Sequence, residues 1–440
     1  MRIIILLCVI ITYYMLLYAK PFSPLTKIPG PKLAGQYVRV RPDVVHINDP
    51  TSIEKLYSQS PKQRCERYWT IPQTLQATGS ILATQDHELH RKRRVPVIND
   101  ALANLFYRMD GWAKTGEPVR MNVAFRAATK DTIQAYAFGE GDKCLDKEDC
   151  NTAFFDISDQ LAHLGTHFFW LATFLNNLPP KLMTILVPKI GVFADFVEIF
   201  HEIIRSDIPE SEKQTHRLTE EAMMIVIAGS ETTASTLAAI MYRLLSDRIL
   251  FNRLRAELET AMPDCDELPI ASKLDSLPLL NAIIEEALRL YPVATHRQDR
   301  TCPNEDLVYE APNGRIRLIP AGSSVGMAAL ILNRNPGFYD QPDEFRPERY
   351  LEDPNLSKYH ISLSKGTRQC IGINLAYQEL QTFTAGIIRR YDLYDPTKQA
   401  QSGPTLELYR TTRADVSMYS DFIATTSYKG SPGLRVMIRN

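Results

Sequence analysis

The 440-residue chain has little glycine, few tryptophans and almost no net charge, with 20 Gly, 3 Trp and 50 Lys and Arg against 51 Asp and Glu. A nucleic-acid-binding domain usually has a basic excess, so this charge balance indicates no nucleic-acid partner. Hydrophobic residues make up 45% of the chain and charged residues 23%. These are ordinary globular proportions, which exclude wholesale disorder, collagen-like repeats and a polytopic membrane protein.

Cysteines are also few. The chain has seven, an odd number with no Cys-x-x-Cys pair, at positions 8, 65, 144, 150, 265, 302 and 370. This spacing argues against a disulfide framework and against a structural zinc site. It fits a reducing compartment.

One long run without charge lies at the N-terminus, from Ile3 to Ala19. As a helix, these residues would span about 25 Å, the short end of a membrane span. A cleaved signal peptide is the alternative, but no A-x-A cleavage site follows the run. Only Arg2 precedes it, whereas several basic residues follow, so the positive-inside rule leaves the rest of the chain in the cytosol. We therefore expect residues 1–20 to be a single-pass anchor.

The segment after this run is rich in proline. Because proline fixes φ and removes a hydrogen-bond donor, we expect residues 21–34 to be a stiff, extended hinge. No internal repeat or low-complexity tract follows it. We therefore assign residues 35–440 to one catalytic domain.

Helical patterns dominate the rest of the chain, and strand patterns are minor. We expect helices over 218–247, over 279–291 and from just after Cys370 to 389, a strand over 37–47, and a hairpin over 315–325 that turns at Pro320-Ala321-Gly322. In the first helix, Thr219 is the expected N-cap. Its middle is apolar on most faces, which predicts that it lies buried at the centre of a large domain.

Cys370 is the most informative residue for chemistry. It lies in Gly366-Thr-Arg368-Gln-Cys370-Ile-Gly372, directly before an expected helix. A sulfur at a helix N-terminus is close to the positive end of the dipole and to free N–H groups, and a nearby arginine lowers its pKa further. The pattern favours a thiolate, which either attacks a substrate or holds a soft metal. A buried structural cysteine is the alternative, and the glycine–arginine–glycine spacing argues against it.

A second chemical motif, Ala-Gly-Ser-Glu231-Thr232-Thr, lies within the helix over 218–247. A glycine inside a helix costs about 1 kcal/mol relative to alanine. Threonine can bond back to the carbonyl four residues earlier and bend the helix, and a carboxylate in an apolar helix is costly unless it is used. We interpret the motif as a kinked helix with an acid–alcohol pair, and a polar helix seam is the alternative.

These motifs resemble the cytochrome P-450 family. The segment around Cys370 is similar to the haem-thiolate signature Phe-x-x-Gly-x-Arg-x-Cys-x-Gly, with Leu363 in place of the phenylalanine. The resemblance implies a mainly α fold with minor β sheets, in which a long buried central helix lies over haem b and a cysteine loop lies beneath it. It implies that Cys370 is the axial thiolate ligand of the iron, that Arg368 pairs with a propionate, and that Gly366 and Gly372 shape the loop.

Two more segments match the family in the right order. The resemblance implies that Glu231 and Thr232 deliver protons to bound dioxygen. It also implies a structural network of Glu286, Arg289 and Arg349, the last within Phe-Arg-Pro-Glu-Arg-Tyr. On its own the Glu–Arg pair is weak evidence, because such i,i+3 pairs are common on surface helices, and the helical wheel places both residues off the apolar stripe.

The remaining implied haem contacts are cationic. His87 and Arg91, one helical turn apart, match a His-x-x-x-Arg variant of the propionate-binding helix. Either Arg297 or Arg300 would reach the other propionate region. The basic run 92–94 is either a solvated face or a surface for an acidic redox partner.

The resemblance implies a haem-thiolate monooxygenase that uses dioxygen and takes electrons from NADPH through NADPH–cytochrome P-450 reductase. It would hydroxylate a small apolar organic molecule at the endoplasmic reticulum membrane, with its catalytic domain in the cytosol. The sequence around Cys370 resembles that of family members from filamentous fungi that act in secondary metabolism, such as the trichodiene-oxygenase-like group.

The chain is shorter than usual members of the family, and the shortfall lies near residues 31–38, 98–112 and 190–201. A truncated, catalytically impaired homologue that binds haem poorly is therefore the alternative interpretation. A third interpretation keeps the haem but performs rearrangement or dehydration without a reductase, and the intact acid–alcohol pair argues against it.

Overall fold

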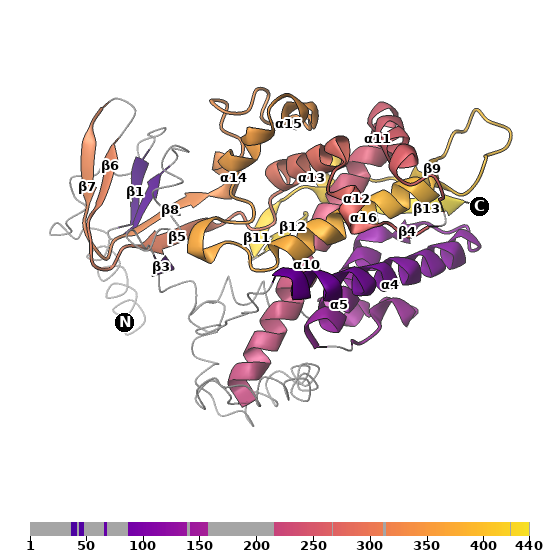
Figure 1. Cartoon of the computed structure of the whole chain (residues 1–440), viewed down its shortest axis with the longest axis horizontal. Coiled ribbons are helices and arrows are strands. Elements are labelled where there is room, and N and C mark those ends of the chain that lie inside the picture. Colours follow the sequence, from indigo (N-terminus) through magenta and orange to yellow (C-terminus); the bar gives the residue numbers. More distant parts are fainter. Residues whose placement is uncertain are drawn as a thin grey trace, which may run out of the picture. The chain divides into compact units, whose positions relative to one another are not determined.

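The computed structural model describes residues 37–41, 44–47, 66–67, 87–138, 141–156, 215–265, 267–310, 314–422 and 424–439. The α-helices are α4 (His87–Ala113), α5 (Met121–Phe138), α10 (Thr215–Ser246), α11 (Arg248–Ala261), α12 (Ala271–Leu274), α13 (Pro278–Leu290), α14 (Ala329–Leu332), α15 (Glu348–Glu352), α16 (Ile373–Arg390) and α17 (Arg413–Val416). Short 3₁₀-helices are η3 (Cys144–Asp146), η6 (Pro354–Tyr359) and η7 (Gly366–Arg368). These elements are drawn in Figure 1.

The strands are short and belong to four sheets. They are β1 (Tyr37–Arg41), β2 (Val44–Ile47), β3 (Glu66–Arg67), β4 (Val119–Arg120), β5 (Arg297–Thr301), β6 (Leu307–Glu310), β7 (Ile316–Ile319), β8 (Ser324–Ala328), β9 (Asp392–Leu393), β10 (Thr405–Leu408), β11 (Ser420–Phe422), β12 (Ala424–Thr426) and β13 (Arg435–Arg439). The predicted mainly α fold with minor sheets is confirmed.

The chain divides into two compact units. The sheet unit contains the described parts of residues 1–71 together with 295–342 and 358–370. The helical unit contains the described parts of 72–294 together with 343–357 and 371–440. The cysteine motif therefore belongs to the sheet unit, and the long helix α10 belongs to the helical unit.

The sheet unit is built around a five-stranded sheet in the order β1-β2-β8-β5-β3. β2 pairs with β8 in parallel, with Val45 opposite Val325, and β8 pairs with β5 in the antiparallel sense. A separate hairpin is formed by β6 and β7. One hydrophobic cluster fills this unit, made of Val45, Ile47, Cys302, Leu307, Tyr309, Ile319, Val325, Met327, Ala329, Leu332 and Ile361.

Two strand predictions are corrected here. The expected strand over 37–47 consists of two antiparallel strands, β1 and β2, with Val38 opposite His46. The expected hairpin over 315–325 is also wrong, because β7 pairs with β6 whereas β8 pairs with β2 and β5. Gly322, at φ 77°, does form the expected turn. An alternating pattern and a turn residue specify local extension and reversal, but not which strand becomes the partner.

The helical unit is organised around α10, which packs against α5, α13 and α16 (Figure 1). The buried apolar residues of its second half fall on several faces, at Ala234, Leu237, Ala238, Ala239, Ile240, Met241, Leu244 and Leu245. The predicted central position of this helix is therefore confirmed. The helix begins at Thr215, so Thr219 lies inside it and is not its N-cap.

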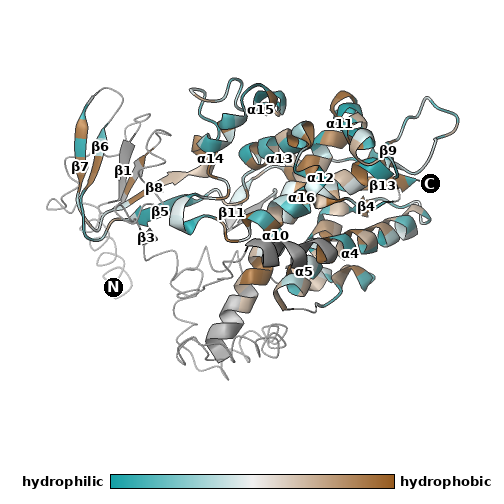
Figure 2. Cartoon of the chain, in the orientation of Figure 1, coloured by the Kyte–Doolittle hydropathy of each residue, from teal (hydrophilic) through white to brown (hydrophobic). Residues whose placement is uncertain are grey.

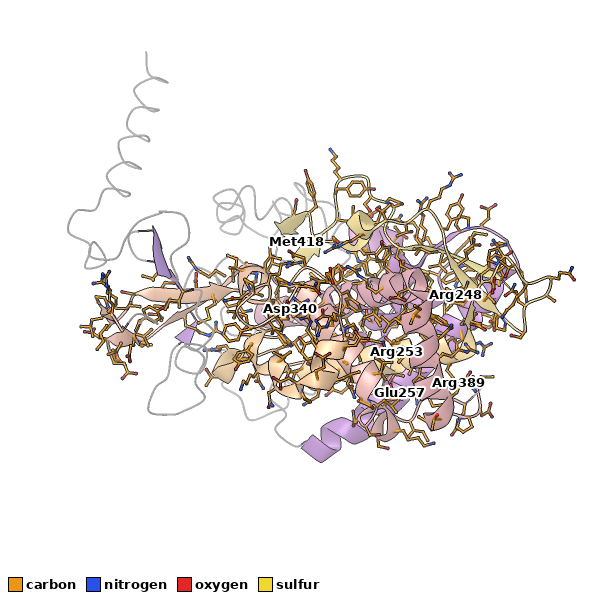
Figure 3. The ribbon with its side chains drawn as sticks, turned by 90° about the horizontal axis from the view of Figure 1, so that it is seen from above. Arg248, Arg253, Glu257, Asp340, Arg389 and Met418 are labelled. Carbon is orange, nitrogen blue, oxygen red and sulfur yellow. The ribbon has the colours of Figure 1, made fainter. Side chains whose placement is uncertain are left out.

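The N-terminal end of α13 is stabilised both by a local proline and by a carboxylate from another helix. Pro278 occupies the first turn, where its missing N–H costs nothing. The N–H groups of Leu279 and Leu280 donate to the Glu257 carboxylate at 2.8 and 2.9 Å. Glu257 lies on α11 and is labelled in Figure 3. The observed bounds of α13 differ from the predicted helix by one residue at each end.

Within the described residues, Met224–Ser246 of α10 is long and apolar enough to cross a bilayer, and Figure 2 colours the described residues by hydropathy. Most of this stretch is buried inside the structure, as expected of a core helix. The predicted anchor (1–20) and hinge (21–34) lie outside the described residues.

Cys302 is disulfide-bonded. The other four described cysteines, Cys144, Cys150, Cys265 and Cys370, are free, so its partner lies outside the described residues. The cysteine spacing argues against a disulfide framework, and it did not predict the bridge at Cys302.

At Gly229, α10 lies close to Ile133 of α5. A Cβ built there would lie 2.6 Å from Cγ1 and 3.0 Å from Cβ of Ile133. Ile133 Cβ is fixed to the main chain, and Cγ1 can move away only if the stiff χ1 of this β-branched residue leaves its rotamer. We expect Gly229→Ala to destabilise the protein, because overpacking costs about 1–3 kcal/mol and outweighs the gain in helix propensity of about 1 kcal/mol.

The matched control is Gly111→Ala in α4, where nothing lies within 4 Å of the added Cβ. It should stabilise the protein slightly or leave it unchanged. Chemical denaturation of both variants measures the difference. If Gly229→Ala were as stable as Gly111→Ala, the close approach would not constrain the fold.

Candidate active site

Residues 363–370 form a loop, called the cysteine loop below, whose shape is held by its own backbone hydrogen bonds. The Cys370 N–H donates to the carbonyl of Leu363 at 2.7 Å, and the Gln369 N–H donates to the carbonyl of Gly366 at 3.1 Å. Ser364 and Gly366 both adopt positive φ, 58° and 73°. The free Cys370 thiol at the end of this loop is partly exposed. The loop therefore presents a sulfur at a fixed position without enclosing it.

Arg300 supports the same loop from β5. Its guanidinium donates to Ser364 Oγ at 2.8 Å and to the carbonyl of Asp299 at 3.0 Å, and the residue is 3% exposed. Arg297 instead forms a two-point ion pair with the Asp299 carboxylate. The two candidate arginines thus differ in role: Arg300 braces the cysteine loop, and Arg297 is paired within its own strand.

The other predicted residues of this region lie on either side of the loop. Arg368, in η7, is exposed. Gly372 is the N-cap of α16, which begins at Ile373 rather than immediately after Cys370. The Ala376 N–H donates to the Gly372 carbonyl at 2.8 Å.

The acid–alcohol pair lies in the middle of α10. The Thr232 hydroxyl donates to the carbonyl of Ala228 at 2.8 Å, the back-bond that the sequence predicted. The Glu231 carboxylate is bound by Arg126 of α5, with Nε and Nη2 at 2.8 and 2.7 Å from Oε1. The Arg126 guanidinium also lies over the ring of Phe155, 4.6 Å from its centroid.

Arg126 is a functional candidate that sequence reasoning missed. It lies 105 positions before Glu231, on a different helix, and no local pattern connects the two. Both side chains are 14% exposed, so water screens the pair less than a surface ion pair.

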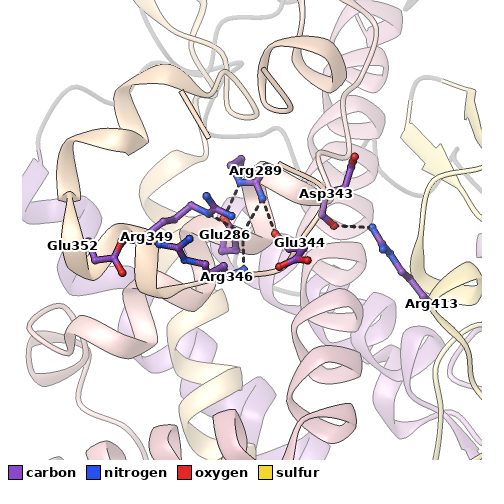
Figure 4. Close-up of polar contacts among 8 residues, drawn as sticks. All are labelled: Glu286, Arg289, Asp343, Glu344, Arg346, Arg349, Glu352 and Arg413. Carbon is purple, nitrogen blue, oxygen red and sulfur yellow. Dashed lines mark hydrogen bonds and ion pairs between the residues drawn. The ribbon is translucent and has the colours of Figure 1, made fainter. Parts of the chain in front are cut away.

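Glu286, Arg289 and Arg349 are brought together in the helical unit (Figure 4). Arg289 binds the Glu286 carboxylate with two hydrogen bonds of 2.7 Å, and Arg349 Nε lies 3.2 Å from Oε1. The Arg346 N–H donates to the same oxygen at 2.8 Å, and Arg289 donates to the Glu344 carbonyl at 3.1 Å. The network thus joins α13 to the segment that leads into α15.

All three charged side chains of this network are buried. Glu286 and Arg289 are fully covered, and Arg349 is 3% exposed. The helical wheel had placed Glu286 and Arg289 off the apolar stripe, which suggested a solvated face. The segment around Arg349 covers that face instead, a contact that only the folded chain supplies.

The structure describes His87 and Arg91 as residues of a helix but does not describe their side chains. Residue 87 begins α4, a single 27-residue helix, which confirms that the predicted helix exists. The side chains of His87, Arg91 and residues 92–94 lie outside the described residues, so their predicted roles stay predictions.

The comparisons with known proteins agree with this geometry. The Cytochrome P450 family model matches residues 77–412 of the chain. The chain belongs to the cytochrome P450 family. One relative, the Cytochrome P450 monooxygenase tpcC of Cochliobolus heterostrophus, is 30% identical over 97% of this chain and 94% of its own length. The Fusicoccadiene C-8 hydroxylase of Phomopsis amygdali is 28% identical over 96% of this chain and 93% of its own length.

A solved structure shows the same fold. The crystal structure of the cytochrome P450DA heme domain superposes with a TM-score of 0.66, at 18% identity, and the match covers 94% of this chain and 97% of that one. Taken with the family match and the relatives, this makes the chain a cytochrome P450 monooxygenase.

The cofactor of this family is haem with a cysteine thiolate on the iron, and the residues of this chain fit it. Cys370 forms no disulfide and is partly exposed, on a loop that backbone hydrogen bonds hold in place. Arg368 offers an exposed guanidinium two residues earlier, suited to a carboxylate.

We expect Glu286→Gln to destabilise the protein strongly. Removing the carboxylate breaks the buried ion pairs of Arg289 and Arg349 with Glu286, which costs about 3–5 kcal/mol. Chemical denaturation of the full chain measures this change.

The control is Glu348→Gln, which removes a carboxylate paired with Arg253 where both side chains are at least a third exposed. Pairs of this kind contribute about 0–1 kcal/mol. Equal effects of the two substitutions would show that the buried network does not support the fold.

Proposed function

We propose that this monooxygenase is anchored in the endoplasmic reticulum membrane and hydroxylates a small apolar molecule in fungal secondary metabolism. NADPH supplies electrons through NADPH–cytochrome P450 reductase. The observation that carries the proposal is the braced loop that presents the Cys370 thiol. The apolar run over residues 3–19 supports the anchor, and fungal relatives named as hydroxylases support the reaction type.

Each residue of the site has a defined task in this reaction. Bound haem supplies the iron at which dioxygen is activated. The Cys370 thiolate holds the iron and donates electron density to it, and Arg300 keeps the cysteine loop in shape through Ser364. Arg368 pairs with a carboxylate of the cofactor.

The acid–alcohol pair moves protons. The hydrogen of the Thr232 hydroxyl is engaged by the Ala228 carbonyl, so its oxygen is available to accept a further hydrogen bond. Glu231 is the ionisable group beside it, and Arg126 holds the Glu231 carboxylate in place until it takes up a proton.

A second candidate function has one specific observation in its favour. The alignment with the relative tpcC extends over 497 positions, more than the 440 residues of this chain, so that relative carries segments that this chain lacks. A catalytically impaired homologue that binds haem poorly would have this property.

The reduced, carbon-monoxide-bound full chain separates the two candidates. A monooxygenase shows a strongly red-shifted Soret band, because the thiolate donates electron density to the iron. Cys370→Ser should abolish this band. The control Cys265→Ser, at an exposed free cysteine, should retain it.

A missing band in the unaltered chain would favour the impaired homologue. A band that persisted in Cys370→Ser would assign the ligand to another residue.

Proton delivery has its own test. We expect Thr232→Ala to release more hydrogen peroxide per NADPH consumed, with proton-dependent turnover reduced by roughly 10²–10⁴-fold. Peroxide and NADPH are measured in the presence of reductase. Thr236→Ala removes a hydroxyl one helical turn later, which donates to the Thr232 carbonyl at 3.0 Å, and should release less peroxide than Thr232→Ala. Unchanged peroxide in Thr232→Ala would contradict the proposed relay.

A further inference from the structure

Cys302 is the one bridged cysteine among the described residues, and the reaction described above does not use it. It directly follows β5 and is 7% exposed, within the hydrophobic cluster of the sheet unit. Four of the other cysteines are free, which leaves Cys8 and Cys65 as candidates for its partner. The choice between them decides which parts of the chain the bridge joins.

The register of the sheet favours Cys65. β3 pairs with β5 in the antiparallel sense, with Glu66 opposite Thr301. In an antiparallel pair, one step back along the first strand is matched by one step forward along the second. The position before Glu66 therefore falls opposite the position after Thr301. These two positions are Cys65 and Cys302.

The backbone of Cys302 indicates how far apart two such positions lie. The Gly322 N–H donates to the Cys302 carbonyl at 2.9 Å, on the side of β5 that pairs with β8. In an extended strand the N–H and C=O groups of one residue point to the same side, so neither group of Cys302 is directed toward β3. A non-hydrogen-bonded pair of this kind has its Cα atoms about 4.5 Å apart, within the range of about 4.4–6.8 Å that disulfides span.

The alternative partner, Cys8, has no comparable support. It lies within the apolar run over residues 3–19, which the sequence predicts to be a membrane anchor. Cys302 instead belongs to the core of the sheet unit, in one cluster with Met327 and Ile361. A bridge from Cys8 would have to connect a membrane span with the interior of this unit.

The bridged residue lies beside the residue that supports the cysteine loop. Residues two apart along a strand share one face of the sheet, and Arg300 and Cys302 both line one pocket of the sheet unit, together with Leu307 and Val325. Arg300 donates the hydrogen bond to Ser364 of the cysteine loop. A covalent link at Cys302 therefore restrains the strand from which the loop is held.

The proposed cytosolic position makes such a bridge responsive to redox conditions. Disulfides are rare in the cytosol, and those that occur there are mostly transient, catalytic or redox-sensing. To open the bridge, two cellular thiols supply two electrons and two protons: the S–S bond breaks, both cysteines become thiols, and the reductant thiols leave joined as a disulfide. Because Cys302 is almost covered, a thiol reaches its sulfur only when the edge of the sheet opens.

We propose that Cys302 is bridged to Cys65, and that this bridge is a redox-sensitive link that holds β3 on β5 and steadies the cysteine loop through Arg300. The link itself goes beyond the proposed function, and its redox sensitivity rests on the proposed cytosolic position. Without the bridge, β3 is an edge strand of two residues, shorter than a typical strand. Opening the bridge thus loosens β5 on this side and weakens the support of the loop.

Peptide mapping of the full chain tests the link. Free thiols are blocked with N-ethylmaleimide before cell lysis, and the protein is digested without reduction. Mass spectrometry should find the peptide of Cys65 joined to that of Cys302, and dithiothreitol should separate the two. A chain that is blocked at both cysteines in the cell, and forms the same link with oxidised glutathione, supports the proposal as its reduced state. A link from Cys302 to Cys8, or no link after oxidised glutathione, would overturn it.

Hydrogen exchange of the backbone amides over residues 363–370 tests the consequence. Dithiothreitol should accelerate this exchange roughly tenfold, because the hydrogen bond from Arg300 loses its support. Cys302→Ser should match the reduced chain and no longer respond to the reductant. The control Cys265→Ser, at an exposed free cysteine, should keep the response. If Cys302→Ser does not fold, Cys65→Ser removes the same bridge and should give the same result.

Two outcomes of the exchange measurement would overturn the role in supporting the loop. One is unchanged exchange when a mapped bridge is reduced. The other is an equal response to the reductant in Cys302→Ser, which has no bridge to open. Neither the peptide map nor the exchange depends on the carbon monoxide spectrum, so a missing thiolate band would reject the proposed function without deciding the bridge.

Discussion

The close packing of α5 against α10 is the constraint on which the rest of the helical unit depends. Gly229 permits it, because any side chain there would collide with Ile133. The approach lets the Thr129 hydroxyl reach the Ser230 carbonyl at 2.9 Å and brings Arg126 to Glu231. The chemistry of the acid–alcohol pair is thus supported by a steric feature one turn away.

Two buried carboxyl groups of the helical unit are stabilised in different ways. Glu286 is paired with two arginines, and it also accepts a hydrogen bond from the backbone of the neighbouring segment. Glu379 of α16 has two hydroxyl partners, and burial raises its pKa. The first arrangement pairs opposite charges and the second removes the charge, and both avoid an uncompensated ion in a region of low dielectric constant.

The sequence predicted those elements of the fold that local signals determine. The helix over 279–291 was predicted within one residue at each end, because a proline marks its start and another follows its end. The pairing of strands was not predicted correctly: β1 and β2 were predicted as one strand, and β8 was assigned to the wrong neighbour. Arg126 was missed for the same reason, since its partner lies on another helix.

The sequence by itself determined the motifs: the glycines and arginine around Cys370, the adjacent Glu231 and Thr232, and the residues of the Glu286 network. These are short patterns whose chemistry depends on spacing along the chain. Only the tertiary structure decided that Arg300 braces the cysteine loop, that Arg126 binds Glu231, and that Glu286 and Arg289 are buried. Such contacts join residues far apart in sequence, and their energies depend on burial and distance, which no local pattern encodes.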